Sequence, residues 1–365
     1  MRIAIVAPAV TNLGVPGLTE VRGGGERYPC ALAVALAKSG ANVDLVTFGP
    51  ERMELRHHSG LGIRVLRPRS WRGDLRDPVN PVLLQLASRY DVIHAHIINK
   101  AAVLLALGAS IHRTKVVITP HGGGARSGIR RGLWKLFDGS LFVSEFARTC
   151  ESELARLPSD VIYGGADALC PSHRERTSNH RDRFLFVGRL TPHKGVDVLI
   201  RALPPGAGLS VVGPIHEKDY FEHLCALAVG KDVEFRVDLS DSELCGLYGN
   251  ARALILPSVE LDWQGRQHHA PELLGLVVLE AMYSGVPVVV SNVGGIPEVV
   301  DDGRTGFVVE PGNVESLRKV LGELACNDDL VCTMGEAARN EAHRRFTWNE
   351  VAAQAYEFYQ RLCET

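Results

Sequence analysis

The fold is constrained most by an alternation of short apolar runs with longer helix-forming segments, which occurs twice along the chain. In the first half, the apolar runs have the length and the β-branched content of buried parallel strands. These candidate strands lie at 2–8, 42–48, 91–96, 115–122 and 139–144. Helical segments such as 31–40 separate them. Strands that alternate with helices form a parallel sheet with helices on both faces, and ligands of such sheets bind beyond the carboxyl ends of the strands.

A polar segment at 162–183, rich in Gly, Pro and charged residues, interrupts this alternation and has the composition of a linker. After it the alternation resumes, with candidate strands at 184–190, 209–214, 233–239, 251–258, 286–292 and 305–310. A chain of 365 residues exceeds the size at which a single core stops growing. We therefore expect an α/β protein of two doubly wound domains, 1–165 and 166–346, that face each other across a cleft.

Charge is distributed unevenly between these two expected domains. Residues 1–165 carry 21 Lys and Arg against 13 Asp and Glu, whereas residues 166–365 carry 19 against 29. One stretch of the first domain holds six arginines: Arg52, Arg56, Arg64, Arg67, Arg69 and Arg72. This excess favours an anionic partner, such as a membrane surface or a phosphorylated acceptor. Arginines that coat a solvated face explain the pattern equally well.

The overall composition is ordinary for a globular protein, at 45% hydrophobic and 22% charged residues. The apolar stretches at 1–10 and 101–111 are far shorter than the roughly 20 residues of a membrane span, and the first lacks the layout of a signal peptide. The eight cysteines show no metal-ligand spacing, which predicts reduced, mostly buried thiols. We expect a cytoplasmic protein without a nucleic-acid partner, with peripheral contact to the inner membrane face as an open alternative.

The run "PELLGLVVLE" at 271–280 places two carboxylates at the ends of an apolar segment. A buried carboxylate is costly unless it is paired. We expect Glu272 on a loop and Glu280 in the first turns of the helix that follows, about 12 Å apart at helical rise. Free backbone N–H groups of the helix start, near Leu274, Gly275 and Leu276, would bind phosphate. A helix with one N-terminal charge and one surface glutamate is the simpler alternative.

Three further motifs follow expected strands. "VGRLTPHKG" (187–195) brings Arg189 and Lys194 to a strand end, where two cations suit a diphosphate and can stabilise a departing phosphate. "RGGGER" (22–27) can bring backbone close to a phosphate but does not match GxGxxG. "TPHGGG" places His121 at another strand end. Each motif alone has a plain structural explanation as a turn or a buried side chain.

Taken together, these motifs resemble the retaining nucleotide-sugar glycosyltransferases of family 4, also called glycosyl transferases group 1. The resemblance covers essentially the whole chain. It includes "GGGE", "DVIHAH", "TPHG", "GRLTPHKG", "LPS", the Glu-x7-Glu run, "EAMYSGVPVVVSNVGGIPEVV", "DGRTGFVV" and "TWNEVAAQAY". It implies the GT-B fold, which has two Rossmann-like domains and a C-terminal helix, here 347–365, that crosses back to the first domain.

The resemblance also implies residue roles. It assigns the donor sugar's hydroxyls to Glu272, the ribose to Glu280, the diphosphate to Arg189 and Lys194, and the vicinity of the anomeric carbon to His121. The phosphates would also meet the loop at Gly23 and Gly24 together with the helix start, and the base would lie near Gly213 and Arg236. Our candidate contacts for the acceptor are His96, Asn99, Lys100 and Arg126.

Three departures from the family pattern stand out. Leu273 and Leu274 replace a pair that ends in Phe, and Val237 stands where Gly is common, which puts the contact to the base in doubt. Between "PS" and Glu272 the chain carries an insertion, "VELDWQGRQHHA" (259–270). We expect this loop to overhang the donor sugar or the acceptor, although an ordinary surface loop explains it nearly as well.

No DxD motif stands where it could hold a metal, so we expect no essential metal and no cofactor. A UDP-linked hexose or N-acetylhexosamine is the favoured donor. Since no second carboxylic acid is spare, we favour same-face attack, in which the departing phosphate takes the acceptor's proton and His121 orients the sugar.

Alternatives from other classes remain open. They are a sugar-nucleotide epimerase, a phosphorylase, a non-catalytic sugar-nucleotide binding protein and, more weakly, an NAD-dependent dehydrogenase, whose glycine fingerprint is absent. The acceptor would be a hydroxyl of a polysaccharide or glycolipid precursor or of a small natural product. The oligomeric state is open.

Overall fold

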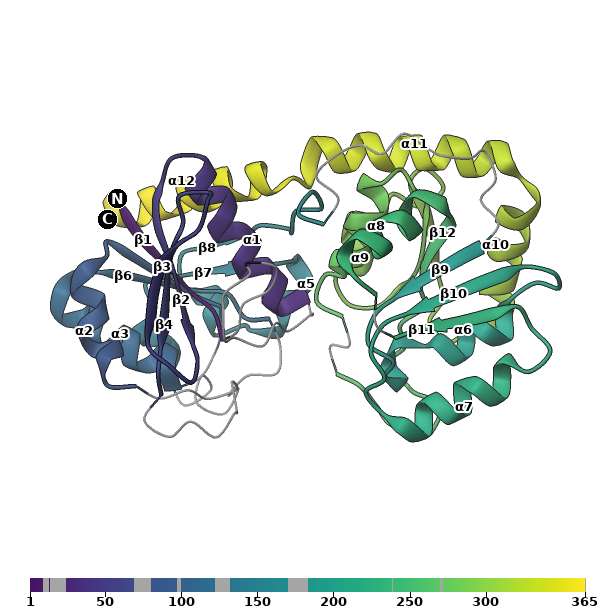
Figure 1. Cartoon of the computed structure of the whole chain (residues 1–365), viewed down its shortest axis with the longest axis horizontal. Helices are drawn as coiled ribbons and strands as arrows, with labels where there is room; N and C mark the ends of the chain where they lie inside the picture. Colours follow the sequence, from purple (N-terminus) through teal and green to yellow (C-terminus); the bar gives the residue numbers. More distant parts are fainter. Residues whose placement is uncertain are drawn as a thin grey trace. The chain divides into compact units, whose positions relative to one another are not determined.

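The computed structural model describes residues 1–8, 13, 24–68, 80–96, 100–121, 132–169, 183–237, 239–269 and 272–364. The chain divides into two compact units, each built on one sheet (Figure 1). Unit 1 comprises Met1–Gly165 together with Trp348–Thr365, and unit 2 comprises Ala166–Thr347. Each unit is an α/β sheet covered by helices, so the expected fold class is confirmed.

Unit 1 holds an eight-stranded sheet in the order β3-β4-β2-β1-β5-β6-β7-β8. Its strands are β1 (Arg2–Val6), β2 (Asn42–Phe48), β3 (Met53–Arg56), β4 (Gly62–Leu66), β5 (Val92–Ala95), β6 (Lys115–Ile118), β7 (Gly139–Phe142) and β8 (Ser159–Val161). All neighbouring pairs are parallel except β3 and β4. The central strands β1 and β5 are almost wholly buried, as expected for a sheet covered on both faces.

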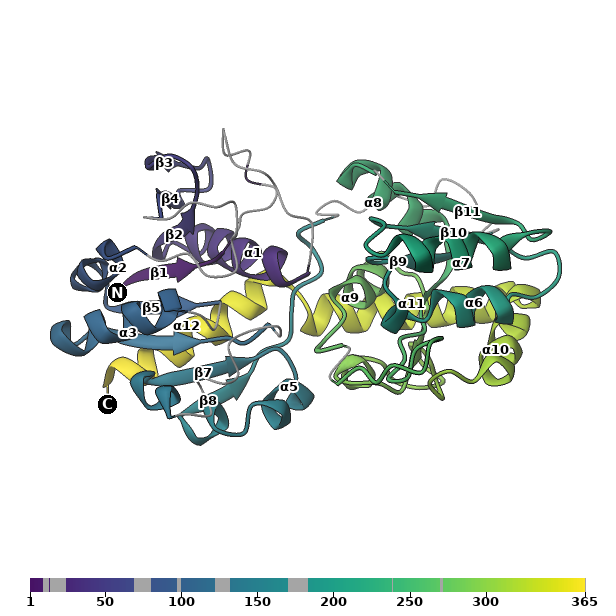
Figure 2. The same cartoon turned by 90° about the horizontal axis from the view of Figure 1, so that it is seen from below.

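The helices of unit 1 lie on both faces of this sheet (Figures 1 and 2). They are α1 (Gly24–Lys38), α2 (Val82–Leu86), α3 (Lys100–His112), α5 (Glu145–Cys150) and α12 (Trp348–Glu364), with short 3₁₀ turns η1 (Ala87–Arg89), η2 (Leu133–Leu136) and η3 (Leu154–Arg156). Helix α12 packs against α1, and α2 packs against α3. The last helix of the chain therefore completes the first unit.

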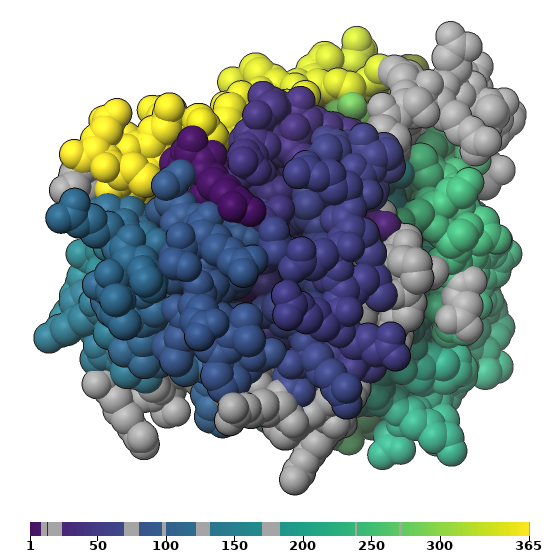
Figure 3. All heavy atoms as spheres, turned by 60° about the vertical axis from the view of Figure 1, so that its left-hand side comes forward, coloured from purple at the N-terminus to yellow at the C-terminus, as the bar shows by residue number. Residues whose placement is uncertain are grey.

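The two ends of the chain meet on the surface of unit 1. The sulfur atoms of Met1 and Cys363 lie 4.0 Å apart. Figure 3 shows α12, in yellow, beside the purple start of the chain. The buried face of α12 carries Trp348, Phe358 and Tyr359, each at most 5% exposed.

Unit 2 holds a six-stranded, fully parallel sheet in the order β11-β10-β9-β12-β13-β14. Its strands are β9 (Arg183–Val187), β10 (Gly208–Val212), β11 (Val233–Arg236), β12 (Ala251–Leu256), β13 (Val288–Ser291) and β14 (Gly306–Val309). Its helices are α6 (Val196–Ala202), α7 (Lys218–Ala228), α8 (Asp241–Asn250), α9 (Leu276–Tyr283), α10 (Val314–Cys326) and α11 (Asp328–Arg345), with 3₁₀ turns η4 (Pro192–Lys194) and η5 (Ile296–Val299). Helices α6 and α7 cover one face, and α8 and α9 cover the other (Figure 1).

Three strands of unit 1, namely β3, β4 and β8, were not among those expected. Strand β4 carries Arg64, which interrupts its apolar pattern. The sheet tolerates this arginine because its Nε atom donates a hydrogen bond to Asp44 Oδ2 at 2.9 Å. The alternating exposure of β3 and the three half-buried residues of β8 are typical of sheet edges, which lack a long apolar run.

One expectation from composition needs correction, that of reduced and mostly buried thiols. The described free cysteines are mostly exposed: Cys225, Cys326, Cys332 and Cys363 lie on the solvent sides of helices and only Cys30 is buried, while Cys245 is disulfide-bonded. Within the arginine-rich stretch, Arg64 is a structural residue, because it also pairs with Glu54 at 2.8 Å and its side chain is 17% exposed. Arg69 and Arg72 lie outside the described residues. Among the helices that the structure describes, none has the length and apolarity needed to cross a membrane.

Candidate functional site

The carboxyl edge of the unit 2 sheet gathers most of the expected site residues. Strand β9 is followed by η4, which ends at Gly195 with a left-handed φ of +66°. A Cβ atom at this position would lie 2.0 Å from the Pro257 carbonyl oxygen, so only glycine fits. This close approach holds the turn that carries Lys194 against the segment that follows β12.

Lys194 and Glu272 form an ion pair at this edge. The Glu272 carboxylate is 7% exposed and also accepts a hydrogen bond from Ser258 Oγ at 3.1 Å. Burial of a carboxylate is tolerated when a cation and a hydroxyl both compensate its charge. Ser258 is the last residue of the "LPS" motif, and its position in the sequence did not predict this contact with Glu272.

Glu280 lies on α9 (Leu276–Tyr283), whereas Glu272 lies on the segment before this helix. Helix α9 begins at Leu276, after Gly275 with φ of +81°, and Leu274 is buried just before it. Tyr248 on α8 donates its hydroxyl to Glu280 Oε2 at 2.9 Å, and Glu280 is 8% exposed. The expected loop and helix positions of the two glutamates are therefore confirmed, whereas the Tyr248 contact was not foreseen because α8 is distant in sequence.

The remaining nucleotide-site candidates lie at neighbouring strand ends. Arg189 is exposed and forms no ion pair with any residue in the described ranges, so its guanidinium is available. Gly213 directly follows β10 with φ of +141°, where a Cβ atom would lie 2.0 Å from the Gly188 carbonyl oxygen. Arg236 is exposed at the end of β11 and pairs with Glu234 at 2.9 Å.

The insertion after β12 forms a hairpin, with an antiparallel bridge between Leu261 and Gln267. The side chain of Asp262 is fully buried and accepts hydrogen bonds from the backbone N–H groups of Gln264 and Arg266 at 2.9 and 3.0 Å. It also accepts from Arg266 Nε at 2.9 Å and lies 2.8 Å from His268 Nε2. Burial alone would raise the pKa of the Asp262 carboxyl group. The hydrogen bonds, first of all that from His268, instead lower this pKa to about 2.

The hairpin is fixed to the rest of unit 2 at both ends. The Trp263 ring stacks on His223 of α7 at 4.2 Å, and Arg266 reaches Glu217 at 3.4 Å. On the other side, the rings of His268 and His193 lie 5.3 Å apart. Burial, reinforced by the Lys194 charge, lowers the pKa of His193 to about 4. The insertion is therefore an ordered element beside Lys194.

Unit 1 places His121 and His96 together at the carboxyl edge of its own sheet. His96 Nδ1 lies 2.9 Å from His121 Nε2, and the two rings are stacked. His96 is 3% exposed. Helix α1 starts beside them: Gly24 is its first residue, and a Cβ atom at Gly25 would lie 3.5 Å from His121 Cβ.

A third histidine extends this cluster toward α12. His94 Nδ1 lies 2.6 Å from the Tyr359 hydroxyl, and His94 Nε2 lies 2.7 Å from Thr119 Oγ1. Burial lowers the pKa of His94 to about 3 and that of His121 to about 4. Burial, with the neighbouring His94, also holds the pKa of His96 well below its ordinary value. All three rings are therefore neutral at neutral pH.

Three of the expected site residues, Gly23, Asn99 and Arg126, lie outside the described residues. Lys100 is described: it is the first residue of α3 and is exposed. Within the described part of the chain, no three His, Cys, Asp or Glu side chains are grouped so that they could hold a metal ion.

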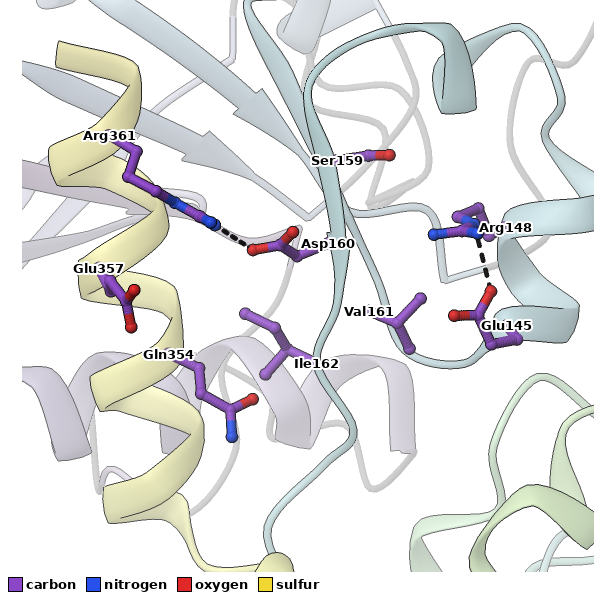
Figure 4. A pocket seen from close by; sticks show the side chains of 9 residues that line it. All are labelled: Glu145, Arg148, Ser159, Asp160, Val161, Ile162, Gln354, Glu357 and Arg361. Atoms are coloured by element: carbon purple, nitrogen blue, oxygen red, sulfur yellow. Dashed lines mark hydrogen bonds and ion pairs between the residues drawn. The ribbon is translucent and has the colours of Figure 1, made fainter. Parts of the chain in front are cut away.

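A separate pocket of about 350 Å³ lies in unit 1 between β8, α5 and α12 (Figure 4). It is lined by Glu145, Arg148, Ser159, Asp160, Val161, Ile162, Gln354, Glu357 and Arg361. Two ion pairs, Arg361 with Asp160 and Arg148 with Glu145, already engage its cations. It contains none of the expected site residues.

Comparison with known families assigns both halves of the chain. Residues 23–177 match the model of the glycosyl transferase 4-like domain, and residues 172–341 match that of glycosyl transferases group 1. The D-inositol 3-phosphate glycosyltransferase of Corynebacterium glutamicum is 28% identical over 98% of this chain and 96% of its own. A GDP-mannose-dependent alpha-(1-6)-phosphatidylinositol monomannoside mannosyltransferase of Mycolicibacterium smegmatis is 30% identical over 70% of this chain and 74% of its own.

Solved structures share the fold over the whole chain. HepE of Anabaena, in complex with UDP and glucose, superposes with a TM-score of 0.74 at 22% identity, covering 99% of this chain and 100% of that chain. The sucrose-phosphate synthase of Thermosynechococcus elongatus gives a TM-score of 0.73 at 20% identity, covering 99% and 98%.

Proposed function

Because this chain belongs to the group 1 glycosyltransferases of the GT-B fold, we propose that it moves a hexosyl or N-acetylhexosaminyl group from a nucleoside-diphosphate sugar to a hydroxyl acceptor, with retention at the anomeric carbon. The favoured donor is UDP-linked, and the acceptor is a polysaccharide or glycolipid precursor or a small natural product. UDP is favoured because the similar HepE structure contains it.

The observation that carries the proposal is the ion pair of Lys194 with the buried Glu272, at the strand edge that also holds Arg189 and the start of α9; Arg189 has no ion-pair partner in the described ranges. Two cations and a helix N-terminus at one strand edge suit a diphosphate. The adjacent carboxylate, held by Ser258, suits sugar hydroxyls. Glu280, which Tyr248 orients, would accept hydrogen bonds from the ribose.

In this proposal, the acceptor oxygen attacks the face from which the diphosphate leaves. The bond between the anomeric carbon and the phosphate oxygen breaks, the new glycosidic bond forms, and the acceptor's proton passes to the departing phosphate. Arg189, Lys194 and the N–H groups at Gly275 stabilise the charge that grows on that phosphate. No metal is required, since these groups take over its electrostatic role.

The proposal is tested by turnover with a panel of nucleotide sugars and acceptors, in the presence of excess EDTA. We expect transfer with retained configuration, seen by proton NMR of the first-formed product. Arg189→Ala should lower turnover at saturating donor by roughly 10²-fold, because it removes transition-state stabilisation. Lys218→Ala, at an exposed lysine of α7, is the matched control and should retain full activity.

Each contrary result has a definite meaning. Inverted product would end the retaining mechanism, and loss of activity that Mg²⁺ or Mn²⁺ restores would reveal a metal site. Binding of nucleotide sugars without transfer to any acceptor would instead support a binding protein. Full activity of the Arg189 variant would remove that residue from the phosphate site.

A further inference from the structure

The hydrogen-bonded pair of His96, which is buried, and His121, which is partly exposed, carries an inference about protonation. We propose that His96 is a positioning residue that fixes His121 as the tautomer with its proton on Nδ1, so that His121 offers the substrate a hydrogen-bond donor and not a base. The role of the His121 N–H group toward a sugar rests on the proposed function. The tautomer itself is a property of unit 1 and does not depend on that function.

The geometry leaves a single proton between the two rings. His96 Nδ1 and His121 Nε2 are 2.9 Å apart, which is a hydrogen bond that needs one donor and one acceptor. Both rings are neutral near pH 7, because burial lowers both pKa values. Either His96 donates and His121 accepts, or the reverse.

The second nitrogen of His96 decides between these two arrangements. His96 Nε2 is buried and has no hydrogen-bond partner among the described residues. A buried N–H group without an acceptor is rarer than an acceptor without a donor. The proton of His96 is therefore on Nδ1, and it is donated to His121 Nε2.

His121 must then carry its own proton on Nδ1. Within the described part of the chain this nitrogen has no partner, and His121 is partly exposed. Among the described residues, the titratable groups that face the pair are Tyr28 of α1, with ring centroids 5.2 Å from His121 and 5.8 Å from His96, and His94 of β5. Burial raises the pKa of Tyr28 and lowers that of His94, so both stay neutral and leave the tautomer unchanged.

This tautomer limits what His121 can do in the reaction. An Nδ1–H group donates to an oxygen of the sugar, but it cannot take up the acceptor's proton. The proton released by the acceptor hydroxyl must go to another base, which the proposed mechanism provides as the departing phosphate. The His96–His121 bond thus favours same-face attack over base catalysis by histidine.

The direct test is nitrogen-15 NMR of the full chain labelled at histidine, at pH 7 and without ligand. Long-range proton–nitrogen correlations distinguish Nδ1–H from Nε2–H rings, and comparison with His121→Asn assigns the signals. We expect His121 in the Nδ1–H form. A His121 ring protonated on Nε2, or a positively charged ring, would overturn the inference whether or not the protein transfers sugar.

Variants of His96 test the link to turnover. His96→Asn can keep an N–H donor near the position of Nδ1 and should retain turnover within about threefold. His96→Asp supplies only an acceptor, which should move the His121 proton to Nε2, raise the pKa of His121 and lower kcat at least about tenfold with little change in donor KM. It should also add a basic limb to the pH–rate profile, which the wild-type enzyme lacks between about pH 5.5 and 8, because the protonated His121 ring still donates from Nδ1 and the neutral ring of this variant does not.

Equal turnover and equal pH profiles of the Asn and Asp variants would reduce His96 to a packing residue. If a variant fails to fold, the NMR measurement on the wild-type protein still decides the tautomer. If the tautomer is as expected but no transfer occurs with any acceptor, the proposed function fails and the inference about His96 stands.

Discussion

At the scale of single residues, the two glutamates of the apolar run are each stabilised by a different partner. Glu272 is compensated by Lys194 and Ser258, and Glu280 by the Tyr248 hydroxyl. A charge that is buried with a partner is tolerated, but the same charge becomes costly when the partner is removed. The pair of Lys194 and Glu272 therefore supports both stability and the proposed chemistry.

This dual role can be separated by a double-mutant cycle. Lys194→Met should lower the free energy of unfolding by roughly 3 kcal/mol, because it leaves the Glu272 carboxylate buried without its cation. Glu272→Gln in the Lys194→Met background should recover most of that loss while activity stays absent. The measurement is urea unfolding followed by fluorescence, with turnover assayed in parallel.

The control for this cycle is Lys218→Met, which should leave stability unchanged within about 0.5 kcal/mol because the side chain is exposed. If the double variant were as unstable as Lys194→Met, the cost would come from lost packing of the lysine stem and not from the unpaired carboxylate.

At the scale of elements, the insertion after β12 depends on one buried side chain. Asp262 accepts hydrogen bonds from two backbone N–H groups, from Arg266 and from His268, and so closes the hairpin around itself. The stacking of Trp263 on His223 and the contact of Arg266 with Glu217 fix the hairpin to the α7 side. We therefore expect the insertion to be ordered before any substrate binds.

Asp262→Ala should unfold the hairpin locally while unit 2 remains folded, because the lost bonds lie within the insertion. Amide hydrogens at 260–268 should exchange roughly tenfold faster or more, as measured by hydrogen–deuterium exchange with mass spectrometry. Glu260→Ala is the matched control, since Glu260 contributes only its backbone oxygen, which accepts from the His268 N–H group. Unchanged exchange in the Asp262 variant would show that the contacts to α7 suffice to hold the loop.

At the scale of the whole molecule, the last helix of the chain completes the first unit. Trp348, Phe358, Tyr359 and Leu362 are each at most 5% exposed, and Tyr359 bonds to the buried His94. Burial of one such side chain contributes about 1.5–3 kcal/mol. Four of them together match the whole stability of an ordinary domain.

Truncation after Thr347 should therefore prevent unit 1 from folding stably. We expect the shortened chain to bind a hydrophobic dye strongly and to lose the near-ultraviolet circular dichroism of the intact protein. Removal of Glu364 and Thr365 alone is the control and should have little effect. Tyr359→Phe is a milder variant and should cost about 1–3 kcal/mol, because it leaves His94 Nδ1 without a partner. A stable, monomeric truncated chain would show that α12 is dispensable.

Much of the architecture was predictable because it depends on local patterns. Apolar runs of strand length and the helices between them indicated two parallel sheets, and Gly275 indicated where α9 begins. Motifs at strand ends placed Arg189, Lys194 and Glu272 at one edge of unit 2. Strand β4 was missed because Arg64 interrupts its apolar run, and the pairing of that side chain with Asp44 depends on a different strand.

The sequence by itself determined which residue types stand at the strand ends, because strand and helix periodicity, glycine positions and motif spacing are local properties of the chain. Only the tertiary structure decided the partners of those residues. Tyr248 reaches Glu280, Tyr359 reaches His94, and His96 meets His121 across gaps of 32, 265 and 25 residues. A hydrogen bond requires two groups to approach within about 3 Å in a specific orientation. Such an approach is set by how the sheets and helices pack, and no local pattern of the sequence encodes it.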